Sequence, residues 1–236
     1  MLLILMSLRR NLVKMEEINK LRIFREKRGR KTSLFTKSVF PGKLFGERIV
    51  RVKGSDFREL SAERSKLGAA ILKGLSQTGL KQGSVVLYLG ASHGYTASFI
   101  SDVVGLDGFV FCLDFSPRVV RDLVFVCESR SNMLPLLENA SNPESYKDRV
   151  PLVDVVYQDV AQRDQVGIFL DNCDVFLKSG GFGLLALKPR SIDVTRKPKD
   201  IYKEVRALLE EKLVVVDYKE LDPFEVDHAF FVVKKK

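Results

Sequence analysis

From residue 85 onward, short runs of apolar residues alternate with segments of helical spacing. The strand-like runs are VVLYLG, FVFCLDF, VDVVYQD and GFGLLALK, and a helix-like stretch follows each of them. Near-continuous apolar strands that alternate with helices are typical of a parallel sheet covered on both faces. The pattern therefore predicts an α/β, Rossmann-like fold.

Three further runs complete the predicted sheet at seven strands. MLPLLEN is a weaker third strand, and LVVVDYKEL and HAFFVVKK come last. No helix lies between the last two, so they must close the sheet as an antiparallel pair, because parallel neighbours need a crossover. Helical spacing also predicts helices over residues 57–75 and 164–180.

The positive charge of the chain is confined to its N-terminal part. Residues 1–53 hold fifteen Lys and Arg against four Asp and Glu, a net charge of +11, whereas the remaining residues carry −2. We therefore expect a basic segment or small subdomain over 1–53 and the α/β domain over 54–236. Such asymmetry fits a polyanionic partner such as nucleic acid, or a solvated tail.

The remaining composition points to a cytoplasmic protein. The opening MLLILMS is too short to span a bilayer and lacks the basic region of a signal peptide. Met15 offers an alternative start. The three cysteines are widely spaced without a CxxC pair, so we expect buried, reduced thiols and no metal site.

The first strand ends in a glycine turn, GASHG, at the edge where α/β sheets bind ligands. Asp114 ends the next strand, and an acid there can accept both hydroxyls of a ribose. The turn lacks the second glycine of a dinucleotide fingerprint, which argues against NAD and favours a nucleoside such as S-adenosylmethionine. A plain strand-to-helix turn is the alternative interpretation.

Several motifs together resemble archaeal fibrillarin, from about Thr36 to the C-terminus. They are RSKLGAAILKGL, VLYLGASHGYTASFISDVVG, LDFSPRVVRDL, YQDVAQRDQ, LKPRSIDVTRKPKDIYK and DPFEVDHAFFVV. The resemblance implies a class I methyltransferase fold and an S-adenosylmethionine-dependent RNA 2′-O-methyltransferase. It also implies work on ribosomal and transfer RNA in a box C/D particle, with a guide RNA, a Nop-domain scaffold protein and a small kink-turn-binding protein.

The resemblance also implies site residues. The proposed catalytic set falls on Lys66, Asp159, Lys188 and His228. The turn and the resemblance together place cofactor contacts on Gly90, Tyr95, Thr96, Asp114, Phe115, Asn139, Ala140, Asp159, Val160, Ala161 and Gln162. A ribose hydroxyl must lose its proton as it attacks, so a lysine that acts as a base or stabilises the alkoxide suits this chemistry.

Two other functions stay open from the sequence. His93, Tyr95 and Asn139 depart from the family pattern, which allows a non-catalytic fibrillarin-like subunit. A small-molecule methyltransferase or NAD enzyme is the third hypothesis, but the basic segment and the RSIDV motif count against it. Read alone, Lys66 suits a solvated helix position and His228 a hydrogen-bonded structural role.

Overall fold

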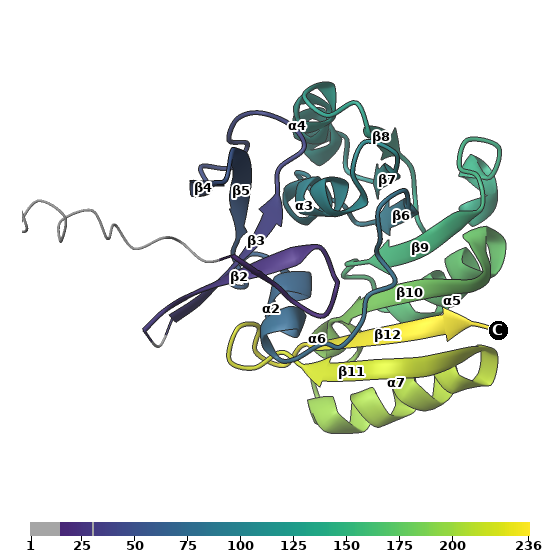
Figure 1. Ribbon diagram of the computed structural model, residues 1–236. Coiled ribbons are helices and arrows are strands. Elements are labelled where there is room, and N and C mark those ends of the chain that lie inside the picture. Colours follow the sequence, from purple (N-terminus) through teal and green to yellow (C-terminus); the bar gives the residue numbers. More distant parts are fainter. Residues whose placement is uncertain (1–14, 30) are drawn as a thin grey trace, which may run out of the picture.

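Two β-sheets form the framework of the protein, for which the computed structural model describes residues 15–29 and 31–236 (Figure 1). The apolar opening MLLILMS and Arg30 of the basic segment lie outside the described residues. No helix in the described ranges is long and apolar enough to cross a membrane.

The larger sheet has seven strands in the order β11-β12-β10-β9-β6-β7-β8. Its strands are β6 (Val85–Leu89), β7 (Phe109–Asp114), β8 (Met133–Leu137), β9 (Val153–Gln158), β10 (Leu177–Leu187), β11 (Leu213–Glu220) and β12 (Ala229–Lys235). The five strands from β10 to β8 are mutually parallel. β12 runs antiparallel to both β10 and β11 and lies between them. The predicted sheet and its antiparallel closure are thereby confirmed.

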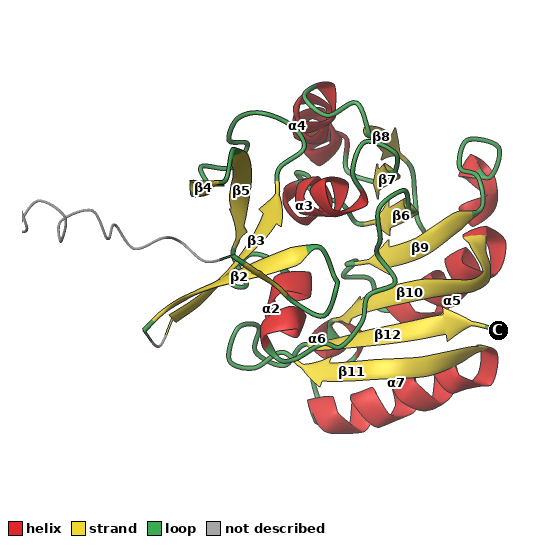
Figure 2. Ribbon diagram, in the orientation of Figure 1, coloured by secondary structure: helices red, strands yellow, loops and turns green. Residues whose placement is uncertain are grey.

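Helices cover both faces of this sheet (Figure 2). The helical elements are α2 (Lys66–Leu72), α3 (Tyr95–Val104), α4 (Pro117–Glu128), η1 (Pro143–Tyr146), α5 (Gln165–Phe176), α6 (Pro189–Ile192) and α7 (Pro198–Lys212). Successive strand residues point to opposite faces: Val86 and Tyr88 pack with α2, α3 and α4, whereas Leu87 and Leu89 pack with α5 and α7. This two-sided burial explains the unbroken apolar runs.

The smaller, antiparallel sheet has the order β1-β2-β3-β5-β4. Its strands are β1 (Glu16–Glu17), β2 (Ile23–Arg28), β3 (Lys31–Lys37), β4 (Ile49–Val52) and β5 (Ser55–Leu60). Most of the basic segment is thus folded, and the sheet runs on to Leu60, past the predicted boundary at residue 53. The division of the chain into 1–53 and 54–236 stays a prediction.

Two predicted helices were too long. Residues 57–60 belong to β5, because this segment pairs with β3 and β4 in the smaller sheet and Phe57 and Leu60 are buried there, so only Lys66–Leu72 is helical in this region. The helix predicted over 164–180 ends at Phe176. Beyond it, Leu177 already pairs with β9, and the left-handed Gly180 (φ +74°) lies in a register shift of β10.

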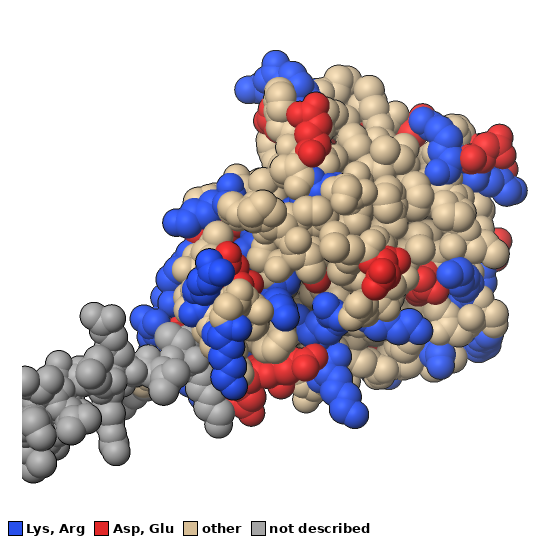
Figure 3. Space-filling view, turned by 45° about the horizontal axis from the view of Figure 1, so that its top comes forward, with Lys and Arg blue, Asp and Glu red and all other residues tan. Residues whose placement is uncertain are grey.

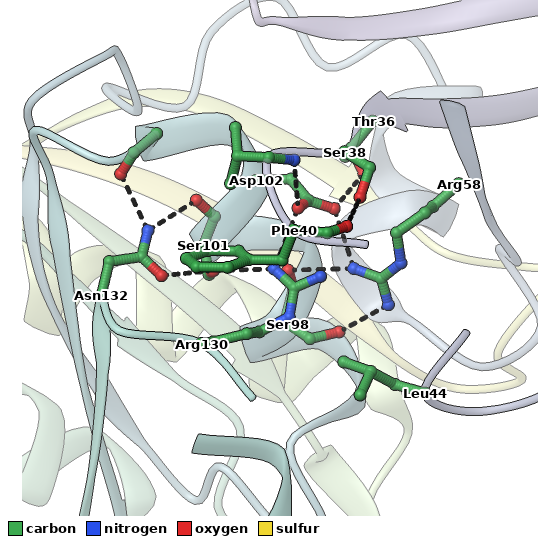
Figure 4. Close-up of polar contacts among 12 residues, drawn as sticks. Thr36, Ser38, Phe40, Leu44, Arg58, Ser98, Ser101, Asp102, Arg130 and Asn132 are labelled. Carbon is green, nitrogen blue, oxygen red and sulfur yellow. Dashed lines mark hydrogen bonds and ion pairs between the residues drawn. The ribbon is translucent and has the colours of Figure 1, made fainter. Parts of the chain in front are cut away.

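A buried charge cluster joins the smaller sheet to the larger domain (Figure 4). Asp102 of α3 pairs with Arg58 of β5 at 2.8 Å and with Arg130 at 2.9 Å, and all three side chains are at most 1% exposed. Thr36 of β3 also donates to Asp102. The other charge of the cluster, Glu47, accepts from Arg58 at 2.7 Å. The cluster fixes α3, whose first residues form the ligand edge of the sheet.

Candidate active site

A crevice with two lobes lies where β6, β7, β9 and β10 end. The larger lobe has a volume of about 780 Å³ and the smaller about 240 Å³. Both are lined by Gly90, Ser92, Asp159 and Lys188, which form the junction between them. The strand ends predicted from the sequence therefore do meet at one place.

The glycine turn brings two strand ends together. Gly90 has a φ of +78°, and a Cβ atom there would lie 2.8 Å from the carbonyl oxygen of Asp159. At Gly94 (φ +87°), a Cβ atom would lie 2.9 Å from the side chain of Leu123. Asp159 N donates to Leu89 O at 2.9 Å. The turn thus positions the backbone of Asp159 as well as opening the crevice.

The smaller lobe has the character of a nucleoside pocket. It is lined by Leu113, Asp114, Phe115, Ala140, Val160, Ala161 and Gln162 besides the junction residues. The Asp114 carboxylate accepts from Ser92 N and Ser116 N, both at 3.0 Å. Each oxygen has a second lone pair for a ligand hydroxyl. Phe115 is 66% exposed, so its ring is free to contact a base.

Three predicted cofactor contacts have polar groups that already contact other protein groups, although Tyr95 and Thr96 line the larger lobe. The Tyr95 hydroxyl accepts from Ser61 N at 3.1 Å, although its ring lines the larger lobe, and burial raises the pKa of this hydroxyl. The hydroxyl of Thr96 donates to Ser65 Oγ. Asn139 is exposed and its Oδ1 accepts from Ser141 N, whereas the smaller lobe is lined by the neighbouring Ala140.

Two lysines flank one carboxylate at the junction. Lys188 Nζ lies 2.8 Å from Asp159 Oδ1 and donates to the Asp159 carbonyl at 3.1 Å. Lys66 Nζ lies 3.3 Å from both carboxylate oxygens. The three side chains are 14–20% exposed. Three of the four predicted catalytic residues therefore form one partly buried ion-paired group that faces the crevice.

The fourth predicted residue, His228, reaches this group through a residue that the sequence analysis missed. Glu225 lies 3.9 Å from Lys66 Nζ and 3.9 Å from His228 Nδ1. Glu225 was part of the quoted motif DPFEVDHAFFVV, so an acid three residues before a candidate histidine was the available signal. His228 Nδ1 lies 2.8 Å from Val226 O, and because a carbonyl only accepts, Nδ1 carries the proton there.

The floor beneath the junction is aromatic and uncharged. Tyr88 and Tyr157 stack with ring centroids 4.3 Å apart, and both are almost fully buried. Burial raises the pKa of each hydroxyl well above its ordinary value, and the charge of Asp159 raises it further, so both tyrosines are neutral. Neutral neighbours of low polarity strengthen the ion pairs above them.

An arginine lies over the aromatic residues of the larger lobe. The Arg64 guanidinium lies 4.1 Å from the Tyr95 ring centroid and 5.9 Å from that of Phe45. In the described ranges, no group of three His, Cys, Asp or Glu side chains is placed to hold a metal ion. The arrangement therefore offers cations, one central acid and a nucleoside pocket.

Comparison with known proteins gives consistent matches over most of the chain. A family model described as Fibrillarin matches residues 13–236. A curated relative from Thermococcus onnurineus, described as a fibrillarin-like rRNA/tRNA 2′-O-methyltransferase, is 51% identical over 201 residues. The match covers 85% of this chain and 89% of the relative.

Solved structures agree with this match. The Methanococcus jannaschii fibrillarin pre-rRNA processing protein has a TM-score of 0.90 at 40% identity, covering 94% of this chain and 97% of that one. Aeropyrum pernix fibrillarin with natively bound S-adenosyl-L-methionine has a TM-score of 0.82 at 40% identity, covering 94% and 99%. A chain of a fibrillarin/Nop5p complex has a TM-score of 0.79 at 36% identity, covering 86% and 94%.

Proposed function

This chain belongs to the fibrillarin family, and we propose that it is an S-adenosylmethionine-dependent RNA ribose 2′-O-methyltransferase acting on ribosomal and transfer RNA. The observation that carries the proposal is the group of Lys66, Asp159 and Lys188 at the junction of the two lobes. At this junction, the three side chains can contact an RNA hydroxyl that enters through the larger lobe and lies next to a cofactor bound in the smaller lobe.

The smaller lobe fits the adenosine part of S-adenosylmethionine. Asp114 would accept the ribose hydroxyls, and the exposed ring of Phe115 would contact the adenine. Its apolar lining, Ala140, Val160 and Ala161, suits a base better than a phosphate. When bound, S-adenosylmethionine supplies an electrophilic methyl group on a sulfonium.

The residues of the chain supply the rest of the chemistry. Lys66 and Lys188 present ion-paired ammonium groups where the attacking ribose oxygen builds negative charge. A cation held in place there stabilises the developing alkoxide without reorganisation. Asp159 orients both lysines, and His228, with its proton on Nδ1, has Nε2 left to accept a proton. Aligning the hydroxyl with the methyl group would supply much of the rate.

A non-catalytic fibrillarin-like subunit is the second candidate function. The observation that favours it is the Tyr95 hydroxyl, which is turned toward Ser61 and away from ligand binding. Asn139 likewise contacts Ser141 and does not line the smaller lobe. The ion-paired lysines count against this alternative, because a scaffold has no need of two cations around a partly buried acid.

The partners follow from the same proposal. A Nop-domain protein is the scaffold, as the fibrillarin/Nop5p complex of a relative supports. We further propose a box C/D guide RNA, which selects the target nucleotide by base pairing, and a kink-turn-binding protein. Because the three cysteines are free and buried, a reducing compartment suits the fold, and we propose that the particle works in the cytoplasm.

A reconstitution tests the function. The protein is incubated with labelled S-adenosylmethionine, guide RNA, target RNA and the two partner proteins, and methylated nucleotides are mapped. We expect one ribose methylation opposite the guide, and its loss in Asp159→Ala with the fold retained. Calorimetry with S-adenosylmethionine and NAD separates the alternatives. Cofactor binding without methylation would support the non-catalytic subunit, and binding of NAD alone would refute both.

A further inference from the structure

We propose that Glu225 is a positioning residue for Lys66, a role that rests on the proposed methyl transfer. The side chain is 25% exposed and lies between two members of the catalytic set. One carboxylate oxygen lies 3.9 Å from Lys66 Nζ, and the other lies 3.9 Å from His228 Nδ1.

The two lysines at the junction are held differently. Lys188 has two contacts with Asp159 alone, through the carboxylate at 2.8 Å and the carbonyl at 3.1 Å. Lys66 lies farther from Asp159, at 3.3 Å, on a flexible four-carbon side chain. A second acid on another side of the ammonium therefore restricts where Nζ can lie. Lys66 donates to Asp159 and lies within ion-pair distance of Glu225, so at least one of its three N–H groups remains for the substrate oxygen.

Glu225 also balances the charge of the site. Two lysines against Asp159 alone would leave one excess positive charge in a partly buried crevice. Glu225 brings the four side chains to zero. Charges that are only partly exposed are costly unless they are paired, so the second acid lets two cations share one small site.

The loop that carries Glu225 is well anchored. It joins β11 to β12, and Leu221 N donates to His228 O at 2.9 Å across its base. Lys73 of the segment after α2 donates to Asp222 O at 2.8 Å, and Arg190 pairs with Asp227 at 2.9 Å. A carboxylate on a loop held at three points can fix its partner within the tolerance that catalysis needs.

The first test is a set of variants in the reconstituted particle. Glu225→Gln should lower the single-turnover methylation rate about 10²-fold, as expected when a reacting group is misplaced. S-adenosylmethionine affinity should stay within about twofold, because the nucleoside lobe is untouched, and Glu225→Asp should recover part of the rate. Asp222→Asn is the matched control, since it removes a charge from an exposed side chain of the same loop and should keep the rate.

A double-mutant cycle tests whether Glu225 acts through Lys66. Lys66→Met with Glu225→Gln should be no slower than Lys66→Met alone, because the second change has nothing left to position. If the two rate losses multiply, Glu225 acts independently of Lys66 and the proposal is wrong. A wild-type rate in Glu225→Gln would overturn it equally.

A third measurement does not depend on activity. In ¹⁵N spectra of lysine ammonium groups, the Lys66 signal is the one that Lys66→Met removes. It should shift in Glu225→Gln and stay unchanged in Asp222→Asn. If the wild-type particle transfers no methyl group, the proposed function is wrong. The spectrum still tests separately whether Glu225 contacts Lys66. An unmoved signal in Glu225→Gln refutes the positioning role.

Discussion

At the ends of the strands, the close packing of the backbone limits which residue types fit, and Gly90 is one such position. A Cβ at Gly90 would press on the Asp159 carbonyl, whereas one at Gly74, also left-handed at φ +84°, would meet open space. We expect Gly74→Ala to cost about 1–2 kcal/mol of unfolding free energy and to keep activity.

Gly90→Ala should cost a further 1–3 kcal/mol or so and lower methyl transfer about 10²-fold by displacing Asp159. Denaturant unfolding and single-turnover assays measure the two effects. If the two variants lose the same stability and keep the same methylation rate, the close approach of Gly90 to Asp159 does not affect function.

Asp102 is the residue on which the buried cluster depends. Asp102→Asn leaves the guanidinium groups of Arg58 and Arg130 buried beside a neutral amide. Breaking such a pair should cost about 3–5 kcal/mol of unfolding free energy. Asp107→Asn, an exposed change near the same helix, should cost little. Denaturant unfolding measures both variants. If the unfolding midpoint of Asp102→Asn is close to that of Asp107→Asn, Asp102 does not hold the buried cluster together.

For single residues, the sequence predicted where in the fold a residue lies better than which neighbours its side chain contacts. Asp159 and Lys188 could be placed because each follows a recognisable strand, and strand ends converge at one edge. The meeting of Lys66 with Asp159 depends on how α2 packs, and the family resemblance alone suggested it. The turning of Tyr95 toward Ser61 and the approach of Glu225 to Lys66 are tertiary contacts with no local signal.

Among the elements, the smaller sheet is tied together by several ion pairs, including that of Arg58 with Glu47. Burial alone would raise the pKa of Glu47, but hydrogen bonds from Phe45 N and Arg58 hold it below its ordinary value of 4.5. A carboxylate with a lowered folded-state pKa stabilises the fold above about pH 4.5, and this stability is lost as the pH falls through the folded value.

We therefore expect Glu47→Gln to destabilise the protein most at neutral pH, with a difference from wild type that shrinks below about pH 4.5. Unfolding free energies from denaturant titrations between pH 3 and 7 measure this. A difference that does not vary with pH would mean that Glu47 acts through shape and not through charge.

The elements that the sequence misassigned share a physical cause. In β5, Phe57 and Leu60 are buried on opposite faces of the strand. Their spacing of three residues also fits a helix, so the helix-forming segment that follows extended the apparent helical period back over them. In β10, Lys178 to Gly180 are exposed and interrupt the apolar pattern, so the sequence did not indicate that the strand begins at Leu177. The long parallel strands and α7 were predicted well because their apolar periods are unbroken.

For the whole molecule, the distribution of charge suggests where RNA binds beyond the crevice. Figure 3 shows many Lys and Arg side chains on the side that carries the smaller sheet. The arginines there are mostly engaged: Arg25 pairs with Glu16 and Arg28 with Glu26. Lys27, Lys31 and Lys43 are exposed, and no ion pair of the described residues includes them. These lysines are therefore the better candidates for phosphate contacts.

Changing these three lysines to glutamine should weaken RNA binding and flatten its salt dependence by about 0.7 log–log unit per lost contact with a single strand. S-adenosylmethionine affinity should not change. The matched control changes the exposed Lys197, Lys203 and Lys212 instead, which likewise take part in no ion pair of the described residues. RNA titrations at several salt concentrations compare the two proteins, and identical slopes would show that the smaller sheet does not contact RNA.

The position of β12 has a consequence for how the protein is made. Ribosomes release a chain from its N-terminus, so β10 and β11 emerge before the strand that lies between them. During synthesis this half of the sheet has a vacant position that no earlier segment fills. The loop with Glu225 and His228 leads directly into β12, so we expect it to reach Lys66 once β12 fills that gap. The strand of this sheet that is translated last would then complete the site.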